Sequence, residues 1–182
     1  WDSMSHADGT VCNHAAPVAS VEAQALAYDA LVEAATLHPT PALLLDAAAR
    51  LERAVETQLW IDDPEGGFYA IGVDRDPSSG AARRLETRAS NMGWLLASRL
   101  LDRPEHAGRR RRLVELLLSD EFLAEGGIRT LSAREARFRP RAYHNGNVWG
   151  FDNYLISLGF VRHGFGDEAQ ELQRRLVASC RA

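Results

Sequence analysis

The stretch from Tyr143 to Asn153 (YHNGNVWGFDN) gathers the side chains best suited to chemistry in this chain. It places three aromatic rings, an imidazole, three carboxamides and a carboxylate around two glycines. Aromatic faces stack on the apolar faces of sugar rings, while Asn, His and Asp make directional hydrogen bonds to hydroxyl groups. The stretch therefore indicates a pocket for a polar ligand, with carbohydrate as the first candidate. For Asp152 alone, capping of the following helix is the alternative.

The same stretch resembles the YHNG-x-VW-x-x-D-N segment of bacterial glycogen-debranching-type proteins of the amylo-α-1,6-glucosidase family. Other matching segments follow in the same order: WDS with HADG (1–9), VEAQ (21–24), SNMGWLL (90–96), GGIRTLSARE (126–135) and HGFGDEA (163–169). The resemblance runs nearly end to end. It implies a six-hairpin (α/α)6 barrel of twelve helices and the hydrolysis of α-glucosides.

Two carboxyl groups are needed for glycoside hydrolysis, one to protonate the leaving oxygen and one to activate water or attack the sugar carbon. Asp2, beside Trp1 in the WDS segment, is the candidate acid, because burial against an aromatic ring raises the pKa of a carboxyl group. An upstream W-x-D-S of the resembled family is the alternative source of this acid. Glu135 is the candidate base, with Arg134 beside it to favour ionisation, and a surface ion pair is the alternative.

The resembled motifs also imply a set of substrate-binding residues. These are Trp1, His6, Asp8, Glu22, Gln24, Asn91, Tyr143, His144, Asn145, Trp149 and Asp152. Local roles remain open for some of them, because an Asp in a loop can form a turn and a Glu in a first helical turn is favoured by the helix dipole. No cofactor and no metal are expected, since the hydrolysis needs only carboxyl groups and water.

Apolar residues at helical spacing dominate the chain between these motifs. Helices are expected over about 18–37, 41–60 and 152–163, with others starting near 90, 104 and 167. Residues 62–80, rich in turn formers, predict a small exposed β-hairpin. The expected fold class is all-α: an array of α/α hairpins, roughly half of an (α/α)6 barrel, with a β-hairpin insertion and long polar loops that gather on one rim.

The composition of the chain indicates the number of domains and argues against some classes of partner. With 182 residues, 46% of them hydrophobic and 25% charged, the chain fits one globular domain, 1–182. A net charge of −4 argues against a nucleic-acid partner. No apolar run approaches the ~18 residues of a membrane span, and the first residues do not resemble a signal sequence. Two cysteines without metal-ligand spacing fit a reducing compartment, so a cytoplasmic location is expected.

The chain starts with Trp1, partway through a motif of the resembled family. It is therefore expected to be part of a longer glycosidase; a non-catalytic carbohydrate-binding remnant and a helical scaffold are the alternatives. Half a barrel would leave apolar faces uncovered at its two ends, which a homodimer or the missing N-terminal half would bury. The residues expected on these faces are Val21, Tyr28 and Val32 at one end and Leu172, Leu176 and Val177 at the other.

Overall fold

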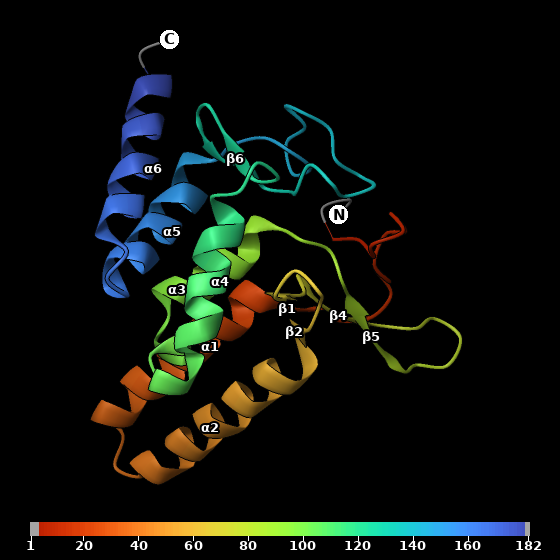
Figure 1. The fold of residues 1–182 in the computed structure, drawn as a ribbon. Coiled ribbons are helices and arrows are strands. Elements are labelled where there is room, and N and C mark those ends of the chain that lie inside the picture. Colours follow the sequence, from red (N-terminus) through yellow and green to blue (C-terminus); the bar gives the residue numbers. More distant parts are fainter. Residues whose placement is uncertain (1–3, 181–182) are drawn as a thin grey trace.

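The structure is a computed structural model that describes residues 4–180, and it consists mainly of helices with small sheets between them (Figure 1). The α-helices are α1 (Val21–Leu37), α2 (Pro41–Gln58), α3 (Trp94–Ala97), α4 (Ala107–Leu117), α5 (Gly150–Arg162) and α6 (Gly166–Ser179). Short 3-10 helices flank α3 and α4: η1 (Ser90–Gly93), η2 (Arg99–Leu101) and η3 (Pro104–His106). The strands are β1 (Ala19–Ser20), β2 (Trp60–Ile61), β3 (Phe68–Tyr69), β4 (Gly72–Arg75), β5 (Ala82–Leu85), β6 (Leu123–Ala124) and β7 (Gly127–Ile128).

Helices that follow one another in sequence pack as hairpins. The short links 38–40 and 163–165 join α1 to α2 and α5 to α6, and each pair is in extensive contact. In Figure 1 the α1–α2 pair lies at the bottom of the molecule and the α5–α6 pair at the upper left. The short helix α3 contacts both α1 and α5 and so connects the two hairpins. The expected array of α/α hairpins is confirmed.

Local sequence sets the ends of these helices. Pro41 occupies the first turn of α2, where its missing N–H is no loss. At the other end of the molecule, Gly164 has a φ of 83°, a left-handed conformation that favours glycine and stops α5. Phe165 N–H then donates to the carbonyl of Phe160 (2.9 Å), which closes the turn into α6.

Several expected boundaries were wrong for tertiary reasons. Residues 18–20 do not start the first helix, because Ala19 and Ser20 pair with Val73 and Gly72 as strand β1. Trp60 likewise leaves the second helix and pairs with Tyr69 in β2–β3. The strand segment of the expected exposed hairpin is buried: residues 68–71 run through the core, while the turns at 64–66 and 77–80 are exposed.

The helix expected from residue 90 is broken into η1, the single turn of α3 and η2. Ser98 causes the second break, because its backbone is extended (φ −82°, ψ 153°) and its hydroxyl accepts a hydrogen bond from Leu100 N–H (3.1 Å). The same hydroxyl donates to Asp29 on α1 (3.0 Å). Leu95, Leu96 and Leu100 in these segments are fully buried.

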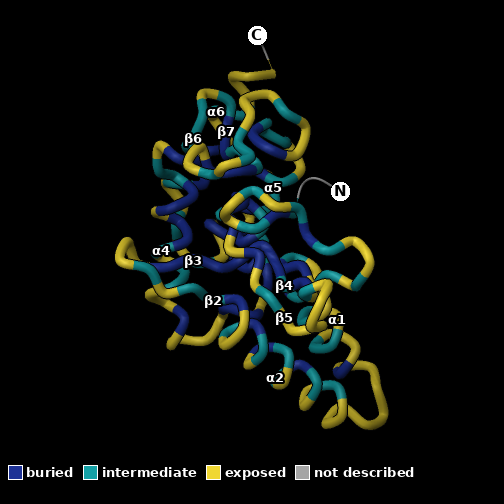
Figure 2. Tube along the Cα trace, turned by 90° about the vertical axis from the view of Figure 1, so that its right-hand side faces the viewer, coloured by how far each residue is buried: buried dark blue, intermediate teal, exposed yellow. Residues whose placement is uncertain are grey.

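The main hydrophobic core lies where the helices meet the buried strand segment, and Figure 2 shows it as a buried centre with the outer turns of α2 exposed. Its largest fully buried side chains include Tyr69, Phe122, Phe160 and Met92. A smaller cluster around Leu85 and Leu131 lies under the N-terminal loop. Both cysteines are free: Cys12 is buried in this smaller cluster and Cys180 is exposed.

Helix α5 lies unusually close to η1 and α3, and two glycines make this approach possible. A Cβ on Gly159 would lie 2.6 Å from Leu96 Cβ and 2.8 Å from Ala97 N. A Cβ on Gly93 would lie 2.7 Å from Ile156 Cγ1. All three distances are too short for real contacts, so no larger residue fits at either position without moving the helices apart.

The uncovered apolar surface differs from the expected one. Val21 and Leu172 are fully buried rather than exposed at the ends of the array, because Val21 packs against the strand segment and Leu172 packs in the main core. Val177 is exposed, as expected. The larger uncovered face is a stripe on α5, together with Leu26 on α1. We call the α5 residues Phe151, Tyr154, Leu158 and Val161 the α5 stripe.

The glycine contact gives the first prediction. Gly159→Ala should lower the free energy of unfolding by about 1–3 kcal/mol, because overpacking outweighs the better helix propensity of alanine. Gly108→Ala on the exposed side of α4, where a Cβ meets nothing within 4 Å, is the matched control and should be neutral or slightly stabilising. Chemical denaturation measures both. A Gly159→Ala protein as stable as the wild type would show that α3 and α5 are not in close contact.

The α5 stripe gives the second prediction. Replacing Leu158 and Val161 by Ser should reduce self-association of the isolated chain, because contiguous exposed apolar surface usually finds a partner. Leu43→Ser on α2, a residue equally apolar and 68% exposed, is the control and should leave association unchanged. Sedimentation velocity over a wide concentration range provides the measurement. A wild-type chain that stays monomeric at the highest concentration contradicts the prediction.

Candidate functional site

A cavity of about 400 Å3 opens where α1, η1, α3 and the start of α5 meet the loop that precedes α5. Its wall combines the polar and aromatic side chains that the sequence singled out with others from distant segments. The polar and aromatic residues that line it are Glu22, Ser90, Asn91, Trp94, Thr130, Tyr143, His144, Trp149, Phe151 and Asp152. We call this cavity the acidic pocket, because Glu22 and Asp152 are the two carboxyl groups in the part of its lining that the structure describes.

Asp152 lies at the base of the acidic pocket in the first turn of α5. Its Oδ2 accepts a hydrogen bond from the Ser90 hydroxyl (2.5 Å), and its Oδ1 accepts one from Trp94 Nε1 (2.6 Å). The N-cap position of α5 is Trp149, and no side chain caps it. The carboxylate of Asp152 therefore serves as a tertiary link from α5 to η1 and α3, and the capping alternative is wrong.

Hydrogen bonds to backbone groups hold the loop before α5 in place. Asn153 donates to the Ile128 carbonyl (2.9 Å) and accepts from Ile128 N–H (2.7 Å), which fixes the β6–β7 hairpin to α5. Thr130 N–H donates to the Asn147 carbonyl (2.9 Å), and Gly146 N–H donates to the Thr130 hydroxyl (3.0 Å). These bonds turn residues 130–149 into a fixed wall of the pocket.

Aromatic rings stand at the mouth of the pocket in two groups. Tyr143 packs edge-on against Trp149 with ring centroids 4.4 Å apart, and Trp149 Nε1 donates to the Tyr143 carbonyl (2.7 Å). On α3 and α5, Trp94 and Phe151 form a second edge-on pair at 5.7 Å. Tyr143 and Phe151 are more than half exposed, so both present ring surface that a sugar could contact.

Glu22, in the first turn of α1, lines the same pocket. Burial raises the pKa of its carboxyl group, and the negative charge of Asp152 raises it further, while Ser20 and Asn91 offset part of the effect. Its Oε2 atom is buried without a hydrogen-bond partner among the described residues. Burial also raises the pKa of Asp152, and the Ser90 and Trp94 donors oppose that rise.

The structure brings together six of the residues predicted for the site and separates the others. Glu22, Asn91, Tyr143, His144, Trp149 and Asp152 line the acidic pocket. Five predicted residues, His6, Asp8, Gln24, Glu135 and Asn145, are absent from its lining. Trp1 and Asp2 lie outside the described residues, so the acid predicted at Asp2 stays a prediction.

Most of the predicted residues that lie outside the pocket make structural hydrogen bonds or ion pairs instead. His6 contacts the buried carboxylate of Asp74 (Nε2–Oδ2, 3.3 Å). Asp8 accepts hydrogen bonds from the Thr10 backbone (2.8 Å) and hydroxyl (2.7 Å), as expected of a turn residue, and these bonds lower its pKa. Gln24 donates to the Ser20 carbonyl (3.2 Å) and lines a different cavity, between α2 and the β1–β4–β5 sheet.

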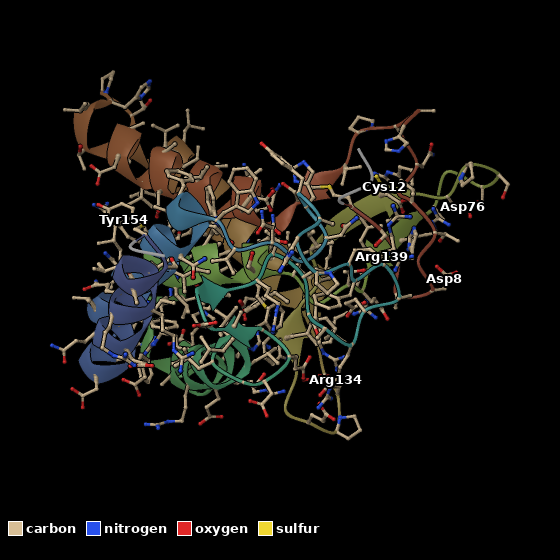
Figure 3. The ribbon with its side chains drawn as sticks, turned by 90° about the horizontal axis from the view of Figure 1, so that it is seen from above. Asp8, Cys12, Asp76, Arg134, Arg139 and Tyr154 are labelled. Atoms are coloured by element: carbon tan, nitrogen blue, oxygen red, sulfur yellow. The ribbon has the colours of Figure 1, made fainter. Side chains whose placement is uncertain are left out.

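Asn145 is buried beneath the loop, where its carbonyl accepts from Arg139 N–H (2.8 Å). Figure 3 places Arg139 and Asp8 on one side of the molecule and Tyr154, on α5, at the other. The hydrogen bond of Asn145 stabilises the long loop, and Asn145 does not line the acidic pocket.

Glu135 is half-buried against the segment that precedes η1. Its Oε1 accepts a hydrogen bond from Arg88 N–H (2.9 Å), and burial raises its pKa. The expected help from Arg134 is not observed, because Arg134 pairs with Glu65 (2.9 Å) and with Glu121 (3.4 Å). Glu135 therefore braces the 88–89 segment, which leads into η1.

Four polar or aromatic wall residues were missing from the predicted set, namely Ser90, Trp94, Thr130 and Phe151. The first two belong to the SNMGWLL segment, which indicated a site motif but not which side chains reach the ligand. Their partner, Asp152, is 62 and 58 residues away in sequence. Only the packing of α5 on α3 brings them together.

No group of three or more His, Cys, Asp or Glu side chains that could hold a metal ion occurs within residues 4–180. Over the same range, none of the helices combines the length and the apolar character needed to cross a membrane.

The helical hairpins, the long loops on one rim and the acidic, aromatic pocket define a domain of the six-hairpin glycosidase type. The sequence model of one such family, the mannosylglycerate hydrolase MGH1-like glycoside hydrolase domain, matches residues 2–182. The chain belongs to this glycoside hydrolase family. The resemblance to six-hairpin glycosidases is thus confirmed, while the debranching type expected from the motifs stays a prediction.

Solved structures show the same fold. The GH63 mannosylglycerate hydrolase of Thermus thermophilus, in complex with Tris, is 24% identical with a TM-score of 0.67; the match covers 88% of this chain and 37% of that one. A second structure of that enzyme, in complex with glucose, has a TM-score of 0.66 and the same identity, with 88% and 39% covered. The neutral trehalase Nth1 of Saccharomyces cerevisiae is 18% identical at a TM-score of 0.64, with 87% and 30% covered.

This chain therefore spans less than two-fifths of the length of these structural relatives. Among curated proteins, none gives a significant match. At these identities the likeness shows the fold, and the substrate has to be argued from the pocket.

The raised pKa of Glu22 gives the third prediction. The folded protein holds the Glu22 proton to higher pH than the unfolded chain does, so stability falls as the pH rises from the ordinary Glu value through the raised one. Glu22→Gln removes this loss and should raise the melting temperature at pH 8 but not at pH 4. The exposed Glu115→Gln is the control and should show no such difference. Equal shifts of the Glu22→Gln protein at both pH values would contradict the prediction.

Proposed function

We propose that this domain binds and helps to hydrolyse an uncharged α-glucoside, as part of an acid–base glycosidase. The observation that carries the proposal is the acidic pocket itself, where two partly buried carboxyl groups share a cavity with exposed aromatic rings. Carboxyl groups bind sugar hydroxyls, and aromatic rings stack on sugar faces. The family supplies the reaction class, and the pocket lining supports the choice of substrate.

The charges of the pocket favour an uncharged sugar over an anionic one. Its lining holds two carboxyl groups, and among the described residues it contains neither Arg nor Lys. A glycerate-like carboxylate in this space would face the negative charge of Asp152, and His144 is the one basic side chain in the described lining. An α-glucoside, including an α-1,6-linked branch of the debranching type, brings only hydroxyl groups, which suit both acceptors and donors in the wall.

For the chemistry, we propose Asp2 as the proton donor. Met4 lines the pocket and Asp2 precedes it by two residues in sequence, which supports this role. The position of Glu135, hydrogen-bonded to Arg88 N–H and outside the lining, does not support its predicted role as the base. Glu22 and Asp152 are the carboxyl groups that the described wall offers to a ligand, and we assign them to substrate binding.

A non-catalytic carbohydrate-binding domain is the second candidate, and the position of Glu135 favours it. Such a domain would bind sugars with the same pocket but would not hydrolyse them. An interface with further helical hairpins, through the α5 stripe, is compatible with either candidate.

Substrate choice gives the fourth prediction. Hydrolysis should be detected with isomaltose, panose or 4-nitrophenyl α-glucoside, and not with mannosylglycerate, when glucose or mannose release is measured. A gene extended upstream of Trp1 should be assayed beside this chain, because the relatives are longer. Release of mannose from mannosylglycerate without release of glucose would reject the α-glucoside assignment. Sugar binding without hydrolysis by either chain would favour the binding domain.

Trp149 gives the fifth prediction. Trp149→Ala should weaken sugar binding at least tenfold and lower the melting temperature only slightly, because the ring lines the pocket mouth and packs on Tyr143 rather than in the core. Tyr154→Ala, an exposed aromatic outside the pocket, is the matched control and should bind like the wild type. Isothermal titration with glucose or methyl α-glucoside measures both. An unfolded Trp149→Ala protein with unchanged affinity per folded molecule would place Trp149 in the core.

A further inference from the structure

Two carboxyl groups from different helices face one small cavity in this domain. Glu22 comes from the first turn of α1 and Asp152 from the first turn of α5, and both line the acidic pocket. Two neighbouring carboxyl groups do not ionise independently, because the first negative charge disfavours the second. The contacts around each group decide which of them keeps its proton.

Asp152 is surrounded as an ionised carboxylate should be. Each of its oxygen atoms accepts a short hydrogen bond, from the Ser90 hydroxyl (2.5 Å) and from Trp94 Nε1 (2.6 Å). An indole N–H can only donate, so the Trp94 contact requires an acceptor on Asp152. With both oxygens engaged by donors from η1 and α3, Asp152 is the group that ionises first.

Glu22 is less fully provided with donors. Ser20 and Asn91 lower the pKa of its carboxyl group, but burial outweighs them. Its Oε2 atom is buried and has no hydrogen-bond partner within residues 4–180. A buried carboxylate oxygen without a donor is unfavourable, and protonation reduces that penalty. The charge of Asp152 acts in the same direction. A protonated carboxyl group can donate a hydrogen bond, which a carboxylate cannot.

We infer that Glu22 recognises the sugar in its protonated form, as a donor to a hydroxyl oxygen of the substrate, while Asp152 remains ionised and anchors the pocket floor. The inference rests on the proposed function and adds a division of labour between the two carboxyl groups. It makes sugar binding depend on a proton that the protein itself holds. Affinity should therefore fall at alkaline pH although the ligand carries no charge.

The effect of Glu22 on sugar binding has to be distinguished from the effect of other titratable side chains in the pocket. Among the described residues, the titratable side chains of the lining are Glu22 on α1, Tyr143 and His144 on the loop before α5, and Asp152 on α5. The segments η1 and α3 contribute Ser90, Asn91 and Trp94, which do not titrate in this range. His144→Gln therefore serves as the control for an imidazole effect on binding.

The test is isothermal titration of the full chain with glucose and with methyl α-glucoside between pH 5 and pH 9. For the wild type, the dissociation constant should rise by up to about tenfold per pH unit once Glu22 ionises. Glu22→Gln keeps a neutral donor and should bind with an affinity that does not fall at alkaline pH. Glu22→Ala should bind about 3- to 10-fold more weakly at low pH, as expected for one lost hydrogen bond. His144→Gln should keep the alkaline fall.

Outcomes of the titration separate this inference from the proposed function. If the wild type binds neither sugar, both are overturned. If the wild type binds but Glu22→Gln keeps the same alkaline fall, or His144→Gln abolishes it, the role of Glu22 is overturned and the proposed function stands. A ligand-free measurement decides independently: carboxyl 13C shifts should show Asp152 ionising at lower pH than Glu22, and the reverse order overturns the inference.

Discussion

The close approach of α5 to η1 and α3 is the constraint on which the candidate site depends. Asp152, Ile156 and Gly159 lie at successive turns on one face of α5, so a single packing contact fixes all three. Gly159 admits the Leu96–Ala97 backbone, and Ile156 fills the space left by Gly93. With the helices at this separation, Asp152 is within hydrogen-bond distance of Ser90 and Trp94. The two glycines therefore act on the pocket without lining it.

A second constraint is the attachment of the loop to the same helix. Asn153 follows Asp152 in sequence, and its side-chain amide contacts the β6–β7 hairpin. It accepts a hydrogen bond from Ile128 N–H and donates one to the Ile128 carbonyl. The two side chains thus hold α5 between α3 on one side and the β6–β7 hairpin on the other. Because residues 130–149 are bonded to this hairpin, the aromatic mouth around Tyr143 and Trp149 is fixed relative to the acidic floor. Such preorganisation reduces the entropy lost when a ligand binds.

The carboxyl groups of the acidic pocket affect both the stability of the fold and the choice of ligand. Both carboxyl groups are partly buried and have raised pKa values, which lowers the stability of the folded domain at neutral pH. Proteins tolerate such groups mainly where they serve a site. A sugar can supply hydroxyl groups to the polar wall and ring faces to the aromatic rims, and it adds no charge to an already acidic cavity. The family match gives glycoside hydrolysis as the reaction class, and the acidic wall favours a neutral substrate within it.

The sequence by itself determined the helical hairpins and most of the pocket mouth, because periodicity and motif composition are local properties. The expected spans of α1, α2 and α5 and the expected starts of α4 and α6 agree with the structure to within a few residues. Tertiary structure decided which face of a helix is covered, so Leu158 is exposed although its spacing fits the core. It also decided which carboxyl groups meet: Glu135 turns to Arg88, while Glu22 and Asp152, 130 positions apart in sequence, share one pocket. Hydrogen-bond partners so distant in sequence leave no local pattern, because their distance depends on how the helices pack.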